Sequence, residues 1–204
     1  MSFDTKPYIL GGFIDAYYRA GMNAFVNKAI MRQSTANLSV NMMIQVPTRI
    51  GYIIGYKSIA ANCGIENKFL NNVATGLVMT PISGLLESCN AYPRERVFQN
   101  ARHGFIARGV REVAFAYAIN TTDNPIGVGI SAYFSHVPHI LSTMKLMKPH
   151  VSYPDLFKEY VNGDFMRLVF PAGVLLRTTQ IVGSCAIINV VGPLIYEKIS
   201  QFKS

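Results

Sequence analysis

Long apolar segments alternate with short polar connections along this chain. The segment 124–144 holds no Asp, Glu, Lys or Arg over its 21 residues, and about 20 mostly apolar residues suffice to cross a bilayer as an α-helix. It contains Pro138, and Lys145 and Lys148 follow it, so we expect a kinked membrane helix with a basic end. Five further segments share this pattern: 8–31, 38–56, 69–86, 104–122 and 171–198. The pattern predicts an all-α membrane protein.

Some of these segments carry charged residues near their middle. Arg111 and Glu112 lie in the fourth segment, and Arg177 lies in the last. A charge at the centre of a membrane helix costs about 2.5–3.5 kcal/mol on insertion scales, so each should face a cavity or a partner. Two interpretations stay open. One is a solute site formed by Gln45, Arg111, Glu112 and Arg177, and the other is structural pairing of Arg111 or Arg177 with Glu112 or Glu87.

Short-range spacing predicts further contacts between and within helices. Asp15 and Arg19 are four residues apart, so on a helix they share a face and are predicted to pair. Small residues four apart let two membrane helices approach closely. Two such steps are Gly12 with Ala16 and Thr80 with Gly84.

The composition also favours a membrane protein. Hydrophobic residues make up 50% of the chain and charged residues only 15%, with a mean hydropathy of +0.23. Soluble domains carry about 25% charged residues. The net charge of +8 comes from Lys and Arg at the ends of apolar segments, as in membrane proteins, so we expect no nucleic-acid partner. The opening MSFDTKPYIL has no basic region before an apolar one, so we expect an internal targeting signal.

No motif indicates an enzyme or a metal centre. The sequence contains no P-loop, no GxGxxG and no nucleophile–base motif. Cys63, Cys89 and Cys185 are widely spaced and are predicted to be free thiols. His136 and His139 share a helix face, but no Cys or carboxylate stands at the spacing of further metal ligands. We therefore predict no catalytic residue, no metal and no cofactor.

The chain shows a threefold internal repeat. Three triples share a spacing of four and then nine residues: Gly12/Ala16/Phe25, Thr80/Gly84/Pro93 and Pro125/Gly129/Pro138. Each triple precedes a second apolar segment with a polar residue inside it. The repeat predicts one membrane domain, 1–204, with units at 8–58, 68–122 and 124–199. It has six membrane helices, or five if 8–31 does not span, and a surface helix at 154–161.

Three helix pairs with prolines near basic ends resemble the mitochondrial carrier family. VPHILSTMKLM is similar to the odd-helix motif P-x-[DE]-x-x-[KR]-x-[KR], and DLFKEYVNGDFMRLVFPAGVLLR is similar to the family's surface helix and sixth-helix entry. GFIARGVREVAFAYAI resembles the fourth-helix entry, with Arg111 and Glu112 where many members hold an arginine–acid substrate contact. The resemblance covers most of the chain. It implies a six-helix barrel in the mitochondrial inner membrane, with kinks at Pro93 and Pro138 and bound phospholipid such as cardiolipin.

The gate motifs depart from the family pattern. In carriers, acid–base pairs on the odd helices close one side of the barrel, and [FY]-[DE]-x-x-[KR] on the even helices closes the other. On the odd helices, Glu95 and Lys145 keep charged gate positions, and on the last even helix Tyr196 and Glu197 are followed by Ser200 instead of a basic residue. Apart from Glu95, uncharged residues occupy the acid position and the first basic position of each odd-helix motif: Asn27, Ile30, Phe98, Ile140 and Thr143.

The lost gates favour a structural function over transport, because alternating access needs two gates whose strengths trade off between states. The first hypothesis is a structural accessory subunit of a respiratory-chain or ATP-synthase complex, with membrane lipids and other subunits as partners. The alternative is an active carrier that exchanges a small anionic metabolite, with Arg111 and Arg177 binding the anion. A third is an unrelated membrane scaffold whose prolines mimic the repeat.

Overall fold

The computed structural model describes residues 4–31, 42–92, 94–120 and 125–202, and these are helical without any strand. The all-α prediction is therefore confirmed. The long helices are α1 (Lys6–Met31), α2 (Met42–Asn62), α3 (Lys68–Ala91), α5 (Phe105–Asn120), α6 (Pro125–Phe134), α7 (His136–Met147), α10 (Val174–Ala186) and α11 (Gly192–Gln201). The short ones are η1 (Arg94–Arg96), α4 (Val97–Asn100), α8 (Tyr153–Val161), α9 (Met166–Val169) and the π-helical turn η2 (Ile187–Val191).

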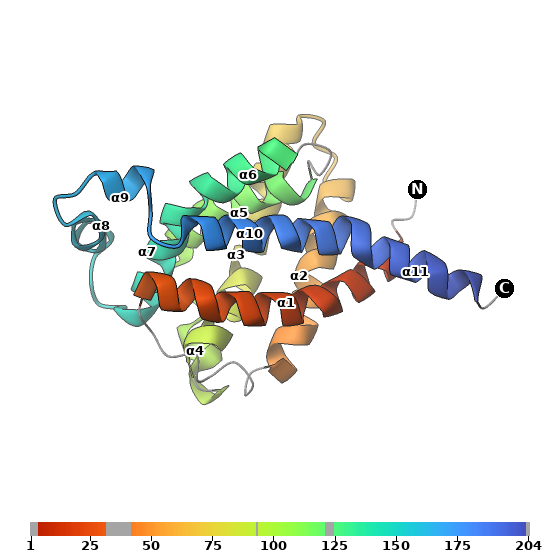
Figure 1. The fold of residues 1–204 in the computed structure, drawn as a ribbon, viewed down its shortest axis with the longest axis horizontal. Helices are drawn as coiled ribbons and strands as arrows, with labels where there is room; N and C mark the ends of the chain where they lie inside the picture. Colours follow the sequence, from red (N-terminus) through yellow and green to blue (C-terminus); the bar gives the residue numbers. More distant parts are fainter. Residues whose placement is uncertain (1–3, 32–41, 93, 121–124, 203–204) are drawn as a thin grey trace.

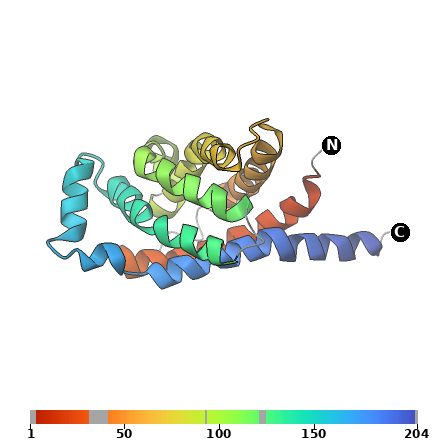
Figure 2. The same ribbon diagram turned by 90° about the horizontal axis from the view of Figure 1, so that it is seen from above.

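The long helices pack as a closed ring in chain order. α1 packs on α2, α2 on α3, α3 on α5, and α5 on α6 and α7. α6 then packs on α10, and α10, η2 and α11 return to α1. α1 and the last helix lie side by side along the long axis, both termini lie at one end, and α11 projects beyond the other helices (Figures 1 and 2). The ring leaves the inward faces of all these helices around one centre.

The helix is interrupted near Pro138, where the sequence predicts a kink. α6 ends at Phe134 and α7 begins at His136, with Ser135 between them. Pro138 has no N–H to donate to the carbonyl of Phe134, four residues earlier, so the helix breaks at this turn. The amide of Ser135 still bonds to Ser131 at 3.0 Å and that of His139 bonds to Ser135 at 3.0 Å, which keeps α6 and α7 consecutive.

The first repeat proline behaves differently. Pro93 lies outside the described residues, but α3 ends just before it, and Tyr92 is extended at φ −128° and ψ 153°. A residue before proline is pushed out of the helical region, so α3 stops here instead of bending. A similar cause acts in the last helix, where Pro193 cannot donate to Asn189 and the amide of Gly192 bonds to Ile187, five residues earlier. The π-helical turn thus keeps the helix continuous from 174 to 201.

The predicted surface helix is present as α8. Its N-cap is Ser152, whose hydroxyl accepts from the amide of Asp155 at 3.3 Å. Leu156 and Val161 are buried against the bundle. The helix ends at Asn162, which takes a left-handed φ of 46° and is followed by Gly163, also left-handed at φ 76°.

The six predicted spans differ in how far their composition supports crossing a membrane. Among the described residues, two segments are long and apolar enough to do so: Lys68–Cys89 and Met166–Gln201. The other helices fall below that limit in length or in mean hydropathy.

Gly12 and Gly84, from the two predicted small-residue steps, lie close to neighbouring backbone. Gly129, in the third repeat unit, does not. A Cβ added at Gly12 would lie 3.1 Å from Cα of Ile50, and one added at Gly84 would collide with the carbonyl oxygen of Ala101. A Cβ at Gly129 would meet nothing within 4 Å. The α3–α5 pair is also close at Gly76, where an added Cβ would lie 2.6 Å from the backbone of Val113.

We expect Gly76→Ala to destabilise the protein by about 1–3 kcal/mol, because α3 and α5 must separate to admit the methyl group. Gly129→Ala is the matched control. It adds the same methyl group to a helix in open space, where alanine is favoured over glycine by about 1 kcal/mol. Thermal unfolding of both variants in detergent measures the difference. Equal melting temperatures would show that the α3–α5 contact is not tight.

Candidate functional site

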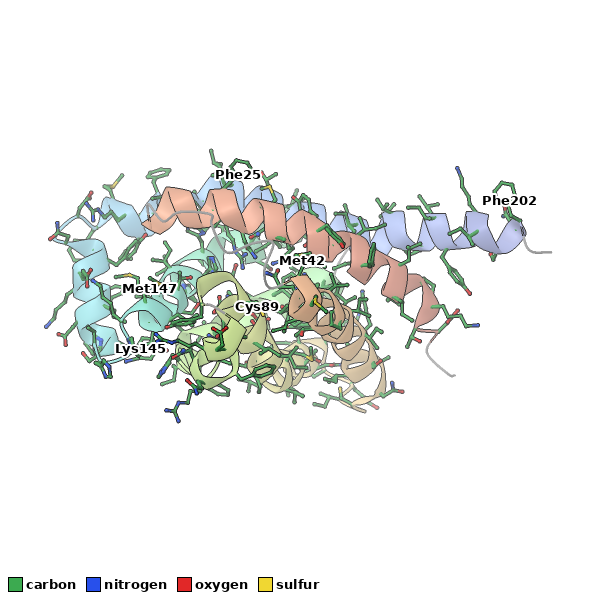
Figure 3. The ribbon with its side chains drawn as sticks, turned by 90° about the horizontal axis from the view of Figure 1, so that it is seen from below. Phe25, Met42, Cys89, Lys145, Met147 and Phe202 are labelled. Atoms are coloured by element: carbon green, nitrogen blue, oxygen red, sulfur yellow. The ribbon has the colours of Figure 1, made fainter. Side chains whose placement is uncertain are left out.

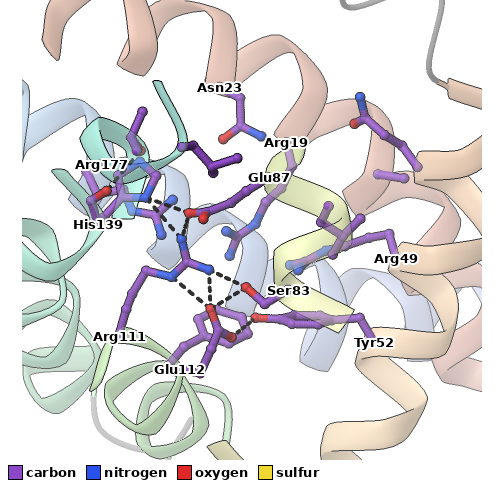
Figure 4. Close-up of a pocket in the computed structure, with 16 residues that line it drawn as sticks. Arg19, Asn23, Arg49, Tyr52, Ser83, Glu87, Arg111, Glu112, His139 and Arg177 are labelled. Carbon is purple, nitrogen blue, oxygen red and sulfur yellow. Dashed lines mark hydrogen bonds and ion pairs between the residues drawn. The ribbon is translucent and has the colours of Figure 1, made fainter. Parts of the chain in front are cut away.

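A cavity of about 70 Å³ lies at the centre of the helix ring (Figure 4). Side chains from α1, α2, α3, α5, α7 and α10 line it. The charged residues among them are Arg19, Arg49, Glu87, Arg111, Glu112 and Arg177. All four residues of the predicted solute site, Gln45, Arg111, Glu112 and Arg177, lie in this lining and are at most 5% exposed. The structure therefore brings together residues that are up to 132 positions apart in the sequence.

Glu112 is the most heavily bonded carboxylate of the cavity. Arg111 donates from Nε at 2.7 Å, and Ser83 of α3 donates its hydroxyl at 2.7 Å. From α2, the hydroxyls of Tyr52 and Tyr56 donate at 2.5 and 2.7 Å. Glu112 is only 1% exposed, so these donors replace the water that an ionised carboxylate would otherwise need. The group joins α2, α3 and α5.

Glu87 forms a second junction, between α3, α5 and α7. Arg108 donates to it from Nε at 2.9 Å, and the guanidinium of Arg111 also bonds to it. On α7, Nδ1 of His139 lies 3.3 Å from the carboxylate and the hydroxyl of Ser142 donates at 3.2 Å. The structural pairing predicted for Arg111 with Glu112 or Glu87 is therefore present with both partners.

Asp15 forms the third junction, between α1, α2 and α10. Nε of Arg49 donates to it at 2.5 Å, and Ser184 of α10 also bonds to it. The predicted pairing with Arg19 exists, but its Nε is 3.9 Å away and donates to Ser184 at 2.6 Å instead. Arg49 is the closer partner of Asp15. Spacing along one helix did not reveal it, because Arg49 lies on α2 and Asp15 on α1.

Arg108 is one of the residues around the cavity that the sequence analysis missed. It is fully buried, and besides Glu87 it donates to the carbonyls of Ala101 at 2.9 Å and His103 at 2.6 Å. It precedes Arg111 by three residues and Glu112 by four, so the three share one helix face. That spacing was the available signal.

The buried charges around the cavity do not balance. Five guanidinium groups, those of Arg19, Arg49, Arg108, Arg111 and Arg177, surround three carboxylates, those of Asp15, Glu87 and Glu112. Among the described residues of this core, the arginines therefore outnumber the carboxylates by two. One of these two surplus charges is that of Arg177, whose predicted pairing with Glu112 or Glu87 is absent among the described residues. Its Nη1 donates to the neutral side chain of Gln180, and its Nε has no partner within the described part of the chain.

The residues of the family's gates do not face one another. Glu95 and Glu197 are exposed and Tyr196 is half-buried, and no ion pair within 4–31, 42–92, 94–120 and 125–202 includes either glutamate. Lys145 donates to the carbonyls of Pro149 at 2.8 Å and Val151 at 2.6 Å, so it fastens the end of α7 to the following turn. The side chain of Asn27 and that of Ile30 lie outside the described part.

The two histidines of α7 have separate surroundings. Nε2 of His136 lies 2.9 Å from the carbonyl oxygen of Ala172, whereas His139 contacts Arg111 and Glu87. No group of three or more His, Cys, Asp or Glu with metal-binding geometry occurs where the structure is described.

The comparisons with known proteins give no match: no family model, no curated protein and no solved structure matches this chain. The resemblance to mitochondrial carriers therefore rests on the sequence motifs alone.

Proposed function

We propose that this chain is a multi-pass protein of the mitochondrial inner membrane with a carrier-like six-helix barrel, and that it serves as a structural accessory subunit of a respiratory-chain or ATP-synthase complex. The observation that carries the proposal is the inverted distribution of side chains. Charged groups lie inside and are cross-linked between helices, while large apolar groups cover the outside. Each half of this pattern supports one part of the proposal.

The apolar exterior supports the membrane location. Large apolar side chains are exposed on α1, α3, α5, α6 and α10, for example Phe13 (46%), Leu77 (53%), Ile106 (70%), Ile126 (74%) and Leu175 (80%). Figure 3 shows side chains standing outward along α1 and the last helix, with Phe25 and Phe202 labelled. Soluble monomers rarely expose so much contiguous apolar surface, whereas lipid solvates it. The buried arginines fit the same environment, because ionisable groups in membrane helices face the bundle interior and pair there.

The cross-linked interior supports a structural function. The carboxylate junctions at Asp15, Glu87 and Glu112 together connect α1, α2, α3, α5, α7 and α10. Alternating access would require several of these helices to separate on each side in turn, and breaking one buried ion pair costs about 3–5 kcal/mol. The gate positions offer no ion pairs to compensate for that cost. The barrel is thus held in one state.

Native electrophoresis after mild detergent extraction of mitochondria tests this function. A tagged chain should migrate with a large oxidative-phosphorylation complex, and the amount of that complex should fall when the chain is depleted. The variant Glu197→Gln changes an exposed residue of α11 and leaves the three carboxylate junctions intact, so it should migrate as the unaltered chain does. Migration of the tagged chain alone, away from every such complex, contradicts the proposal.

A second candidate is exchange of a small anionic metabolite, and Arg177 is the observation that favours it. This side chain is 4% exposed, lines the cavity and has no carboxylate partner among the described residues. Liposomes containing the purified protein and a panel of labelled anions test it. Uptake that is lost in Arg177→Gln and kept in Arg167→Gln, an exposed arginine on α9, would favour transport over the structural function. Absence of uptake for the whole panel would exclude it.

A further inference from the structure

The surplus positive charge is concentrated on the α1–α10 side of the cavity. The three carboxylates are bonded to Arg49, Arg108 and Arg111, each within 3 Å. Arg19 reaches Asp15 only at 3.9 Å, and Arg177 has no carboxylate in the described residues. Figure 4 shows the side chains of Arg19, Arg111 and Arg177 converging on the cavity from α1, α5 and α10. Like charges in a low-dielectric interior repel strongly, and an anion on this side of the cavity would offset that repulsion.

The Arg177 side chain is fixed by neutral groups. Gln180 accepts from its Nη1, and the amide nitrogen of Gln180 donates to Asn23 of α1 at 2.6 Å. Arg177, Gln180 and Asn23 therefore form a chain from α10 to α1 without any negative charge. Single nitrogens of Arg177 (Nε), Arg19 (Nη2) and Arg49 (Nη2) lack a hydrogen-bond partner in the described residues. Unsatisfied guanidinium nitrogens are costly in an apolar interior, and guanidinium groups suit the oxygens of an oxyanion.

The size of the cavity limits the ligand. A cavity needs about 10–15 Å³ to hold one water, so 70 Å³ holds about five to seven groups of that size. A tetrahedral oxyanion has five heavy atoms, whereas a nucleotide is far larger. The two surplus charges match a doubly charged anion.

We infer that this cavity holds one small inorganic dianion of the phosphate or sulfate class, bound between α1 and α10 by Arg19 and Arg177 as a resident structural ligand. The inference rests on the proposed membrane location, since lipid around the helices makes the uncompensated charges costly. Its readout is ligand binding by the isolated chain. Failure of the chain to join a respiratory complex would therefore leave it standing, and absence of the dianion would leave the structural function standing.

Detergent-purified protein tests the inference. The protein is dialysed into chloride buffer, and any retained phosphate or sulfate is released by acid and measured by ion chromatography. Sodium phosphate and sodium sulfate are then titrated against sodium chloride of equal ionic strength, with the unfolding temperature as readout. Mixed micelles with phosphatidic acid form a separate arm, which shows whether the phosphate comes from a lipid headgroup or from solution.

We expect either one retained dianion per chain or saturable stabilisation by phosphate or sulfate that chloride does not give. Arg177→Gln should weaken the apparent affinity by about tenfold or more, because it removes a charged, forked donor. In chloride alone Arg177→Gln should unfold at a higher temperature than the unaltered chain, because it removes a charge that no anion balances. Arg167→Gln, on the exterior, should bind as the unaltered chain does.

A variant that keeps the positive charge controls for the possibility that Arg177→Gln fails to fold. Arg177→Lys retains the positive charge but loses the fork, so it should fold and bind the dianion several-fold more weakly. Stabilisation by phosphatidic acid alone would assign the dianion to a lipid headgroup. No retained dianion together with equal effects of phosphate, sulfate and chloride would overturn the inference, as would an unchanged affinity in both Arg177 variants.

Discussion

Glu112→Gln is expected to destabilise the protein by about 3–5 kcal/mol, the range seen when one partner of a buried ion pair is removed. The carboxylate accepts hydrogen bonds from α2, α3 and α5, and it is 1% exposed. Glutamine keeps the shape but adds two N–H donors where Tyr52, Ser83 and Arg111 already donate. The amide must then face donors, and Arg111 loses half of its negative surroundings. Equilibrium unfolding by denaturant in detergent micelles measures the loss.

Glu197→Gln is the matched control, because it makes the same chemical change on an exposed residue of α11 without an ion pair in the described structure. It should alter stability by less than about 0.5 kcal/mol. A near-zero effect of Glu112→Gln would mean that the carboxylate is already neutral or solvated, and the central junction proposed for the structural function would be wrong.

The helix segments were predictable because their signal is local. The charge-free segment 124–144 and its proline appear as α6 and α7 with a break at Ser135, because a missing amide donor acts within one turn. The small-residue steps were less reliable. Gly84 lies against the backbone of Ala101, yet Gly129, in the same position of its repeat unit, faces open space. Whether a glycine permits close approach depends on the neighbouring helix, and spacing along one helix does not contain that information.

The sequence predicted which residues line the cavity, but it predicted only some of the ion pairs between them. Arg111, Glu112, Gln45 and Arg177 line one cavity because charges inside apolar helices must turn away from lipid. The partners follow from the distances between helices. Thus Asp15 pairs with Arg49, 34 residues away, more closely than with Arg19, and Arg177 meets Gln180 instead of a glutamate. A single sequence without contacts does not distinguish these choices.

The pair of Asp15 and Arg49 should show a large coupling energy. Asp15→Asn alone is expected to cost about 3–5 kcal/mol, because Arg49 would keep a buried positive charge without its counterion. Both side chains are nearly inaccessible, at 0% and 5% exposed, and Nε of Arg49 lies 2.5 Å from the carboxylate. The double variant Asp15→Asn/Arg49→Gln removes both charges. It should therefore cost less than the sum of the two single variants, with a coupling of about 1–3 kcal/mol in a double-mutant cycle.

The exposed pair of Asp164 and Arg167 provides the matched cycle. Its side chains are 55% and 47% exposed and 3.7 Å apart, so water screens their attraction and the coupling should stay below about 1 kcal/mol. The contrast between the two cycles isolates the effect of burial, since both combine an aspartate with an arginine. Equal couplings would mean that water reaches Asp15, and the barrel interior would then be open enough for its helices to move. A large coupling only at Asp15 and Arg49 would place α1 and α2 in a fixed position, as a structural subunit requires.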